Sequence, residues 1–187
     1  MRHEELFYLL ALQKTESIGD VVARKLLDTF GSAEAVFSAK ATEIRSIEGV
    51  GSVRIKNLKD KKVFEQAEDE LQKIDKLQIS SISYLDSDYP ERLRHCPDGP
   101  ILLFASGNIH HQKNRVISIV GTRQVSAHGA DFCRKLINEL APMNPVIISG
   151  FAYGVDIIAH QSAIENNLQT IAVLAHGLNQ IYPKSHR

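Results

Sequence analysis

Three short apolar runs in the last part of the chain constrain its fold more than any other feature. Each run has the length of a β-strand and is followed closely by glycine; the runs are Val116 to Val120, Val146 to Ser149 and Thr170 to Leu174. The first two runs are followed by amphipathic helical patterns. Strands that are apolar throughout are typical of parallel sheets, which are covered on both faces. The sequence therefore predicts a β-α-β-α-β unit of a doubly wound α/β fold.

The polar residues of this region follow the three runs. In such sheets ligands bind at the carboxyl ends of the strands, and the residues there are Gly121, Thr122, Arg123 and Ser126, then Ser149, Gly150, Tyr153, Gly154 and Asp156, and finally His176, Gly177, Tyr182 and Lys184. Neither a G-x-G-x-x-G fingerprint nor a Walker lysine is present. The glycines bring backbone amides close, Ser126 is a predicted helix cap, and Arg123 suits phosphate oxygens. These features predict an anion site for a free nucleotide or for a sugar-phosphate backbone.

Asp156 and His160 stand four residues apart on a predicted helix, so they face the same way. They are either an acid/base couple or structural residues that anchor the helix against the sheet, and we favour the second interpretation. His110, His111 and His128 lack a Cys or carboxylate at metal-ligand spacing, so we expect no metal site. Without a serine nucleophile elbow or a pair of carboxylates, the sequence makes no positive case for catalysis, and no cofactor is expected.

Residues 1–78 are predicted to form a small helical domain. Its expected helices cover residues 4–13, 21–30 and 43–46, a further helix starts at Ser52, and an exposed amphipathic connector covers residues 61–77. Twice within this domain a short helix leads through a hydrophobe-glycine turn into a second helix. This pattern resembles the helix-hairpin-helix motif, in which glycines let the backbone approach a nucleic-acid phosphate.

The second hairpin fits this motif better than the first. Gly49 and Gly51 flank Val50, and four lysines and Arg54 follow with only Asp60 against them, whereas the first hairpin keeps Gly19 alone and places Asp20 beside it. A carboxylate at that position would repel phosphate. The alternative is that both hairpins merely join helices of a bundle, with the lysines on a solvated face.

Between the two regions the sequence predicts strands at residues 79–85 and 101–104, which we expect to extend the parallel sheet of a domain covering residues 79–187. Because the 22 basic and 22 acidic residues cancel, overall charge does not indicate nucleic acid. Cys96 and Cys133 are expected to be isolated thiols. Without a signal peptide or a long apolar run, the chain is expected to be soluble and cytoplasmic. It stops just past the third run, so we expect the front part of a longer protein or a truncated product.

The three motifs together closely resemble the DNA-processing protein A family, also called DprA or Smf. The matching segments are Val120 to Arg123 with Ser126 and Gly129, Ser149 to Asp156 with Ala159 and His160, and Thr170 to Leu174 continuing through Gly177 to Pro183; Tyr89 to Leu93 and Gly107-Asn108 match the segment that leads into the family's Rossmann-like domain. The helical region suits the family's front domain, which is often helix-hairpin-helix-like or SAM-like.

The resemblance implies a binding protein rather than an enzyme. It implies that single-stranded DNA taken up in natural transformation is bound along the strand ends and protected, that the recombinase RecA is loaded onto it, and that the full-length protein forms a homodimer through the Rossmann-like domain. The DNA-binding residues would be Gly121, Thr122, Arg123, Ser126, Ser149, Gly150, Tyr153, Gly154 and Lys184, with Gly49 and Gly51 of the second hairpin.

Two departures from the family pattern stand out. Tyr153 occupies a position where many relatives have Lys or Arg, and the part that completes the sheet in relatives is missing from this chain, which puts its dimerisation in question. The competing interpretation is a nucleotide-processing enzyme of the phosphoribohydrolase type. The chain lacks the run of three glycines and the glutamate-bearing helix of those enzymes.

Overall fold

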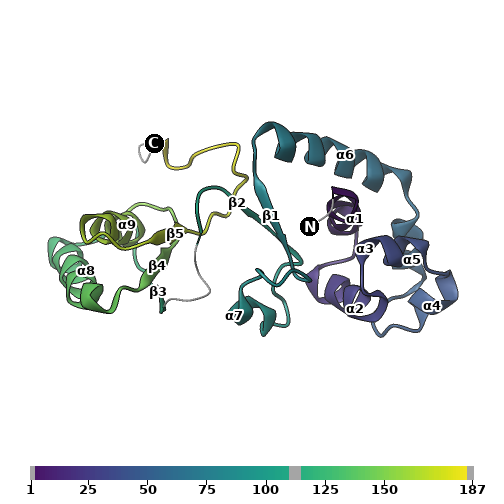
Figure 1. Ribbon diagram of the computed structural model, residues 1–187, viewed down its shortest axis with the longest axis horizontal. Helices are drawn as coiled ribbons and strands as arrows, with labels where there is room; N and C mark the ends of the chain where they lie inside the picture. Colours follow the sequence, from purple (N-terminus) through teal and green to yellow (C-terminus); the bar gives the residue numbers. More distant parts are fainter. Residues whose placement is uncertain (1–2, 110–114, 185–187) are drawn as a thin grey trace. The chain divides into compact units, whose positions relative to one another are not determined.

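A computed structural model of the chain describes residues 3–109 and 115–184 (Figure 1). It divides the chain into two compact units, Met1–Ser106 and Gly107–Arg187, and each unit has its own hydrophobic core. None of the helices in the described ranges is long and apolar enough to cross a membrane. Together the units confirm the predicted fold class, a Rossmann-like parallel sheet preceded by a small helical domain.

The first unit is a bundle of short helices around a central apolar helix. In chain order its helices are α1 (His3–Lys14), α2 (Asp20–Phe30), α3 (Ala33–Ser38), α4 (Ala41–Arg45), α5 (Ser52–Leu58), α6 (Lys61–Lys76) and α7 (Glu91–Arg94). The side chains of Leu9, Leu10 and Leu12 on α1 are fully buried. Such burial around the whole circumference is expected of a helix that is apolar on all sides. Helices α2, α3 and α6 pack around α1 (Figure 1).

Helix α6 is part of this core, so the predicted exposed connector is wrong. Val63, Ala67, Leu71 and Ile74 are buried, and α6 packs along α1. Their spacing of four, four and three residues puts them on one side of a helix. The many charged residues of α6 occupy only the opposite, solvated side.

The two strands before residue 107 also belong to the first unit. Strands β1 (Ser80–Ser83) and β2 (Leu102–Ala105) form an antiparallel pair of their own, with Ser81 opposite Phe104. The expectation that they extend the parallel sheet is therefore wrong. The reason is their packing: Ile101 and Leu102 are buried in the helical core, with Ile79, Tyr84 and Phe104 packed against it. Consequently the compact units divide at residues 106 and 107, whereas we expected the boundary near residue 78.

The second unit contains the predicted β-α-β-α-β arrangement. Its elements are β3 (Val116–Ser118), α8 (Ala127–Leu140), a 3-10 turn (Ala141–Met143), β4 (Val146–Ser149), α9 (Val155–Glu165) and β5 (Thr170–Ala172). The strands are parallel and adjacent in the order β3-β4-β5, with Ile117 beside Ile147 and Ile147 beside Thr170.

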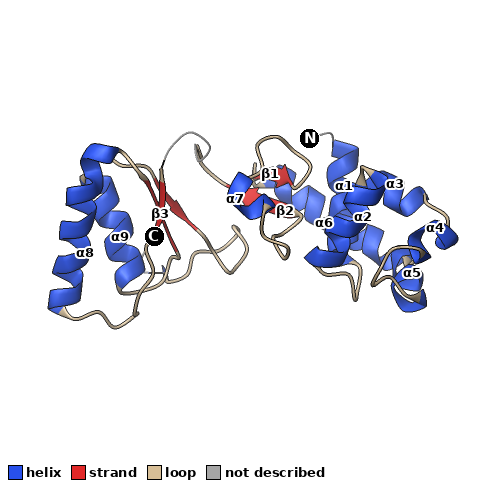
Figure 2. Ribbon diagram, turned by 90° about the horizontal axis from the view of Figure 1, so that it is seen from below, coloured by secondary structure: helices blue, strands red, loops and turns tan. Residues whose placement is uncertain are grey.

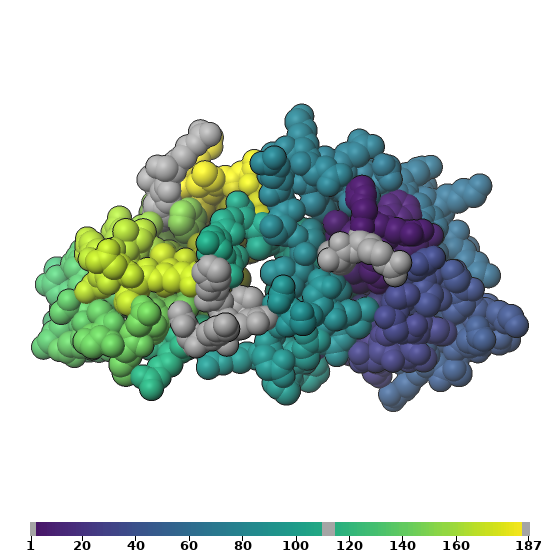
Figure 3. All heavy atoms as spheres, in the orientation of Figure 1, coloured from purple at the N-terminus to yellow at the C-terminus, as the bar shows by residue number. Residues whose placement is uncertain are grey.

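Helices α8 and α9 both cover one face of this sheet (Figure 2). Right-handed crossovers between strands in sequential order put successive helices on the same side, where α8 and α9 pack against each other (Figure 3). Ala130, Ile137, Ile147, Ala159 and Ala163 form the core between the helices and the sheet. Cys133 is also buried there, and burial raises the pKa of its thiol.

Arg24 on α2 is a buried cation that bonds to α7 and to the segment after it. Its guanidinium donates hydrogen bonds to three backbone oxygens and one hydroxyl, those of Leu93, Arg94, Cys96 and Tyr89. Burial raises the pKa of the Tyr89 phenol, which therefore stays protonated and donates to the carbonyl of Pro100 at 2.6 Å. Because these carbonyls lie at the end of the short helix α7 and just after it, Arg24 supplies donors where few helical partners are left.

We expect Arg24→Met to lower the free energy of unfolding of the first unit by about 3 kcal/mol or more, because buried carbonyls would lose their donor. Urea unfolding followed by circular dichroism measures this loss. Lys25→Met on the same helix is the matched control: Lys25 pairs with the exposed Glu48 at 3.0 Å, and such surface pairs contribute about 1 kcal/mol or less. Equal losses in the two variants would contradict the assigned role of Arg24.

Candidate nucleic-acid interface

Two of the three predicted loops meet in direct backbone contact at the carboxyl edge of the sheet. The amide of Val155, at the start of α9, donates to the carbonyl of Thr122 in the β3–α8 loop at 3.1 Å. Gly154 precedes it with φ of 80°, and a Cβ at Gly154 would lie 2.2 Å from the Thr122 oxygen. Any side chain there would therefore force the two loops apart. The sequence predicted this convergence from the strand order, and the structure confirms it.

Gly121 allows a second close approach between the same loops. A Cβ at this position would lie 2.5 Å from a methyl carbon of Val155. The following residues are held by their own short turn, in which the Thr122 hydroxyl accepts a hydrogen bond from the Gln124 amide at 3.1 Å. Ser126 then caps α8 as predicted, since its hydroxyl accepts from the Gly129 amide at 3.2 Å.

Asp156 and His160 brace the β4–α9 loop from behind. The Asp156 carboxylate accepts from the Ala152 amide at 3.2 Å. The imidazole of His160 is 5% exposed and has Nε2 2.6 Å from the Gly150 carbonyl oxygen and Nδ1 2.6 Å from the hydroxyl oxygen of Thr170 on β5. The two side chains thus bond to different groups, which agrees with the structural interpretation of this pair.

Ser149 is placed differently from what the resemblance implies. Its side chain is 3% exposed, and its hydroxyl donates to the backbone carbonyl of Ile119 at 2.7 Å. This bond joins the end of β4 to the residues that follow β3. In this structure the Ser149 hydroxyl therefore holds neighbouring strands together and does not face solvent.

Arg123 and Tyr153 are the large side chains that the two joined loops present to solvent. Arg123 is exposed and forms no hydrogen bond or ion pair with any part of the chain that the structure describes. The side chain of Tyr153 is about half exposed, at 49%. The backbone next to each is fixed, because a Cβ on Gly154 would lie 2.8 Å from the Cα of Arg123. The backbone segments that carry an exposed cation and an exposed aromatic ring therefore adjoin each other at this edge.

The third predicted segment follows β5, the neighbouring strand. The amide of Val173 donates to the Ser149 carbonyl at 2.9 Å, so the chain leaves the sheet beside the β4–α9 loop. It continues to the exposed Lys184, the last residue that the structure describes. Within the described residues no hydrogen bond or ion pair joins Lys184 to the first two loops.

The two hairpins of the helical unit have equivalent backbones. Gly19 and Gly51, which precede α2 and α5, have φ and ψ of −90° and 175° and of −89° and 179°. Two residues earlier, Ser17 and Gly49 both have positive φ, 67° and 87°. The first hairpin resembles the second more closely than its residues indicate, because Ser17 adopts a backbone conformation that is usually left to glycine.

The turns of both hairpins are exposed at Ser17, Gly19, Gly49 and Gly51, and the hairpins differ in the acidic side chain that follows the first. The Asp20 carboxylate accepts from the Ile101 amide at 3.0 Å. Arg54, expected among the free cations after the second hairpin, donates instead to the carbonyls of Ser17 and Gly49 and so links the two turns. Gly49 and Gly51 remain exposed.

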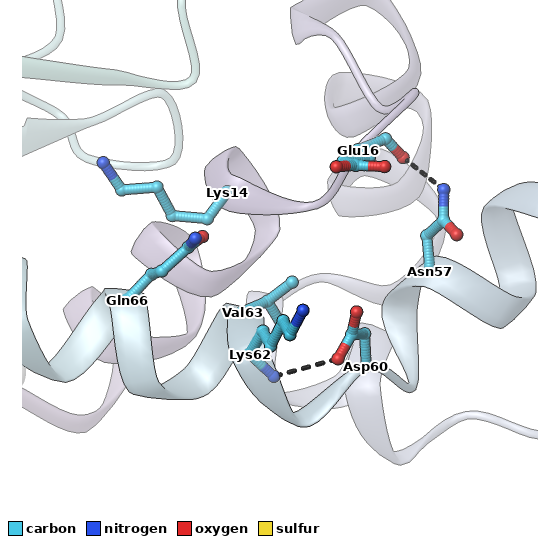
Figure 4. Close-up of a pocket in the computed structure, with 7 residues that line it drawn as sticks. All are labelled: Lys14, Glu16, Asn57, Asp60, Lys62, Val63 and Gln66. Carbon is cyan, nitrogen blue, oxygen red and sulfur yellow. Dashed lines mark hydrogen bonds between the residues drawn. The ribbon is translucent and has the colours of Figure 1, made fainter.

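A small polar hollow lies elsewhere in the helical unit (Figure 4). Its volume is about 70 Å³, and its lining mixes both charges, from Lys14, Glu16, Asn57, Asp60, Lys62, Val63 and Gln66. The Asn57 amide donates to the Glu16 backbone at 3.0 Å, so part of the polar lining is already paired. This volume suits water better than a nucleotide.

In the described part of the chain, no group of three or more His, Cys, Asp or Glu side chains could hold a metal ion. His128 is on α8 in the exposed first turn. His110 and His111 lie outside the described residues.

Comparison with known proteins identifies one family. The family model described as DNA recombination-mediator protein A matches residues 80–187. The chain is 31% identical to Protein Smf of Synechocystis over 195 residues, covering 100% of this chain and 48% of that protein. It is 41% identical to DNA processing protein DprA of Streptococcus pneumoniae over 111 residues, covering 57% of this chain and 38% of the relative. This chain thus spans less than half the length of these curated relatives.

Two solved structures are also similar. The X-ray structure of DprA from Streptococcus pneumoniae matches with a TM-score of 0.77 and 30% identity, over 100% of this chain and 62% of that chain. DNA processing protein A from Helicobacter pylori, whose structure concerns a unique single-stranded DNA binding mode, matches with a TM-score of 0.50 and 30% identity over 58% of this chain and 47% of that chain. The family match begins at residue 80, near the predicted domain boundary at 78.

We expect Gly154→Ala to destabilise the second unit more than Gly107→Ala. Both glycines have positive φ, 80° and 94°, but only the Gly154 substitution adds a clash with the neighbouring backbone, since Gly107 has nothing within 4 Å of a Cβ. Strain alone costs about 1–3 kcal/mol, and we expect about 2 kcal/mol more at Gly154 from the forced separation of the loops. Chemical unfolding measures the difference. Equal effects of the two substitutions would show that loop contact contributes little.

Proposed function

Because the chain belongs to the DNA recombination-mediator protein A family, we propose that it binds single-stranded DNA without reading its sequence. The binding site is the edge formed by the β3–α8 and β4–α9 loops. The observation that carries the proposal is Arg123, an exposed guanidinium with no partner in the described chain, on a backbone locked against Gly154. The described single-stranded DNA binding mode of the Helicobacter pylori relative supports this choice of ligand.

The chemistry of the edge suits a phosphate backbone. Arg123 supplies a planar cation that can donate two parallel hydrogen bonds to phosphate oxygens. Glycines at positions 121, 150 and 154 allow the close packing that fixes the two loops, and Ser126 and Thr122 fix the turn. Lys184 adds a cation from the segment after β5. Contacts of this kind engage phosphate and sugar, and therefore carry no base information.

We infer a binding role rather than catalysis. The acid/base candidates Asp156 and His160 are committed to hydrogen bonds with Ala152, Gly150 and Thr170, and the His160 ring is buried. Both side chains thus have structural bonds within the second unit. These bonds count against the phosphoribohydrolase alternative.

For the whole protein we propose protection of incoming single-stranded DNA in the cytoplasm and help in loading RecA during natural transformation and recombination. RecA and a second copy of the full-length protein are the partners of this proposal. Its support is family membership together with the name DNA processing protein that several relatives carry.

We propose the second hairpin as a separate contact for the strand within the helical unit. Its exposed Gly49 and Gly51 give close access to the backbone, and Lys56 and Lys59 next to it are exposed and have no ion pair in the described residues. We assign it a secondary, purely electrostatic contribution, because Arg54 is used within the unit.

Arg123→Ala is expected to weaken binding of a single-stranded oligonucleotide by about tenfold or more, since a hydrogen bond to a charged group contributes about 1.5–3 kcal/mol. The slope of log Kd against log salt should fall by about 0.7, the value for one phosphate contact on a single strand. Fluorescence anisotropy at several salt concentrations measures both quantities.

Arg134→Ala is the matched control, because it removes the same charge from the same unit. Arg134 is exposed, pairs with Asp131 at 2.9 Å and lies about 12 Å along α8 from the Ser126 cap. Arg134→Ala should leave affinity and slope close to those of the unaltered chain. If both variants lose affinity equally, the effect reflects net charge and Arg123 is not part of a site.

Ser52→Asp tests the hairpin by giving the second turn the carboxylate that Asp20 places in the first. Ser52 is exposed at the first position of α5, where a carboxylate is compatible with the helix. We expect a modest loss of oligonucleotide affinity, about two- to fivefold, smaller than that of Arg123→Ala. Ser38→Asp, at the exposed end of α3, adds the same charge away from the turn. Equal anisotropy results for the two aspartate variants would remove the hairpin from the interface.

A further inference from the structure

Tyr153 is an exposed aromatic residue at a position where a phosphate-binding edge has no need of one. Its side chain is 49% exposed, although a large ring exposed on this scale loses the benefit of burial. It lies in the β4–α9 loop, directly before Gly154, and therefore beside the backbone of Arg123. An exposed ring and an exposed guanidinium on adjoining backbone segments match the two parts of a nucleotide, a flat base and a phosphate.

The backbone that carries the ring is held on both sides. Before it, the Ala152 amide donates to Asp156 at 3.2 Å and the Gly150 carbonyl lies 2.6 Å from His160 Nε2. After it, the Val155 amide donates to Thr122 at 3.1 Å. A tyrosine has only two side-chain torsions, so little conformational freedom remains to be lost on binding. The backbone that carries the ring is thus fixed on both sides.

We propose that Tyr153 stacks on an unpaired base of the bound strand and that this contact makes the site select single strands over duplex. The proposal rests on the function proposed above and assigns its selectivity to one side chain. In a duplex the base faces are covered by neighbouring pairs, whereas in a single strand they are accessible to an aromatic ring. Arg123 then supplies affinity for any phosphate backbone, and Tyr153 adds affinity only where a base face is free.

The test compares three probes of equal length and label: an oligothymidylate, an abasic chain with the same phosphates, and a duplex. Tyr153→Ala should weaken binding of the oligothymidylate by roughly 5- to 100-fold, the range for loss of one stacked base, and should leave binding of the abasic chain and of the duplex unchanged. Tyr153→Phe keeps the ring and should bind like the unaltered chain. Arg123→Ala should weaken binding of both single-stranded probes.

The stacking assignment fails if Tyr153→Ala loses equal affinity for the abasic chain, or if it loses none for the oligothymidylate while the unaltered chain binds it. The proposed function fails, and this inference with it, if the unaltered chain binds neither single-stranded probe. Because the chain contains five tyrosines and no tryptophan, tyrosine emission offers a second readout. Oligothymidylate should quench it, and the part of this quenching due to stacking should be missing in Tyr153→Ala. Unchanged quenching in that variant also counts against the assignment.

Discussion

The backbone contact between Thr122 and the residue pair Gly154-Val155 is the constraint on which the candidate interface depends. It joins loops that belong to two different strands, and it does so through main-chain atoms packed as closely as glycine permits. Behind this contact, Asp156 and His160 hold the second loop to α9 and β5. The edge that we propose to bind phosphate is therefore ordered without a ligand, so binding need not order the loops.

The helical unit depends on a different kind of interaction. Arg24 brings a buried positive charge to a set of backbone carbonyls, and Arg54 links the two hairpin turns through their carbonyls. Both arginines serve the fold, although Arg54 was expected among the free cations after the second hairpin. The first hairpin has likewise given its acidic side chain to the Ile101 amide. Both turns are therefore tied into the unit through Arg54, and only the first also contributes an acidic side chain.

Much of the second unit was predictable because its signals are local. Apolar runs without alternation indicated parallel strands, β4 was predicted with the bounds that the structure has, and the Ser126 cap followed from residue type. The convergence of the loops followed from strand order alone. By contrast, the close approach at Gly154 and the inward hydroxyl of Ser149 depend on how two loops pack, which spacing along the chain does not encode.

The errors in the first unit have one common physical origin. Helix α6 is rich in charged residues, and β1 and β2 have only four residues each. In both cases the place of the segment was decided by what its apolar side chains bury. Val63, Ala67, Leu71 and Ile74 form a narrow stripe that a high charge content conceals. Ile101 and Leu102 resemble the start of another parallel strand, yet they complete the core formed by α1 and α2. The packing of α6 and of β1 and β2 was thus decided by contacts with distant parts of the chain, which a local sequence pattern does not show.

The close packing at Gly154 also bears on how this protein can diverge. The contact between the loops is made by main-chain atoms and glycines, while the residues at positions 123 and 153 are exposed. During evolution a cation can therefore replace an aromatic ring at such a position, or the reverse, without a change in the backbone contact between the loops. Under the proposed function, such a replacement would change which nucleic acid the protein prefers. The glycines at positions 121 and 154 cannot be replaced in this way, because a Cβ at either position would clash with the neighbouring loop.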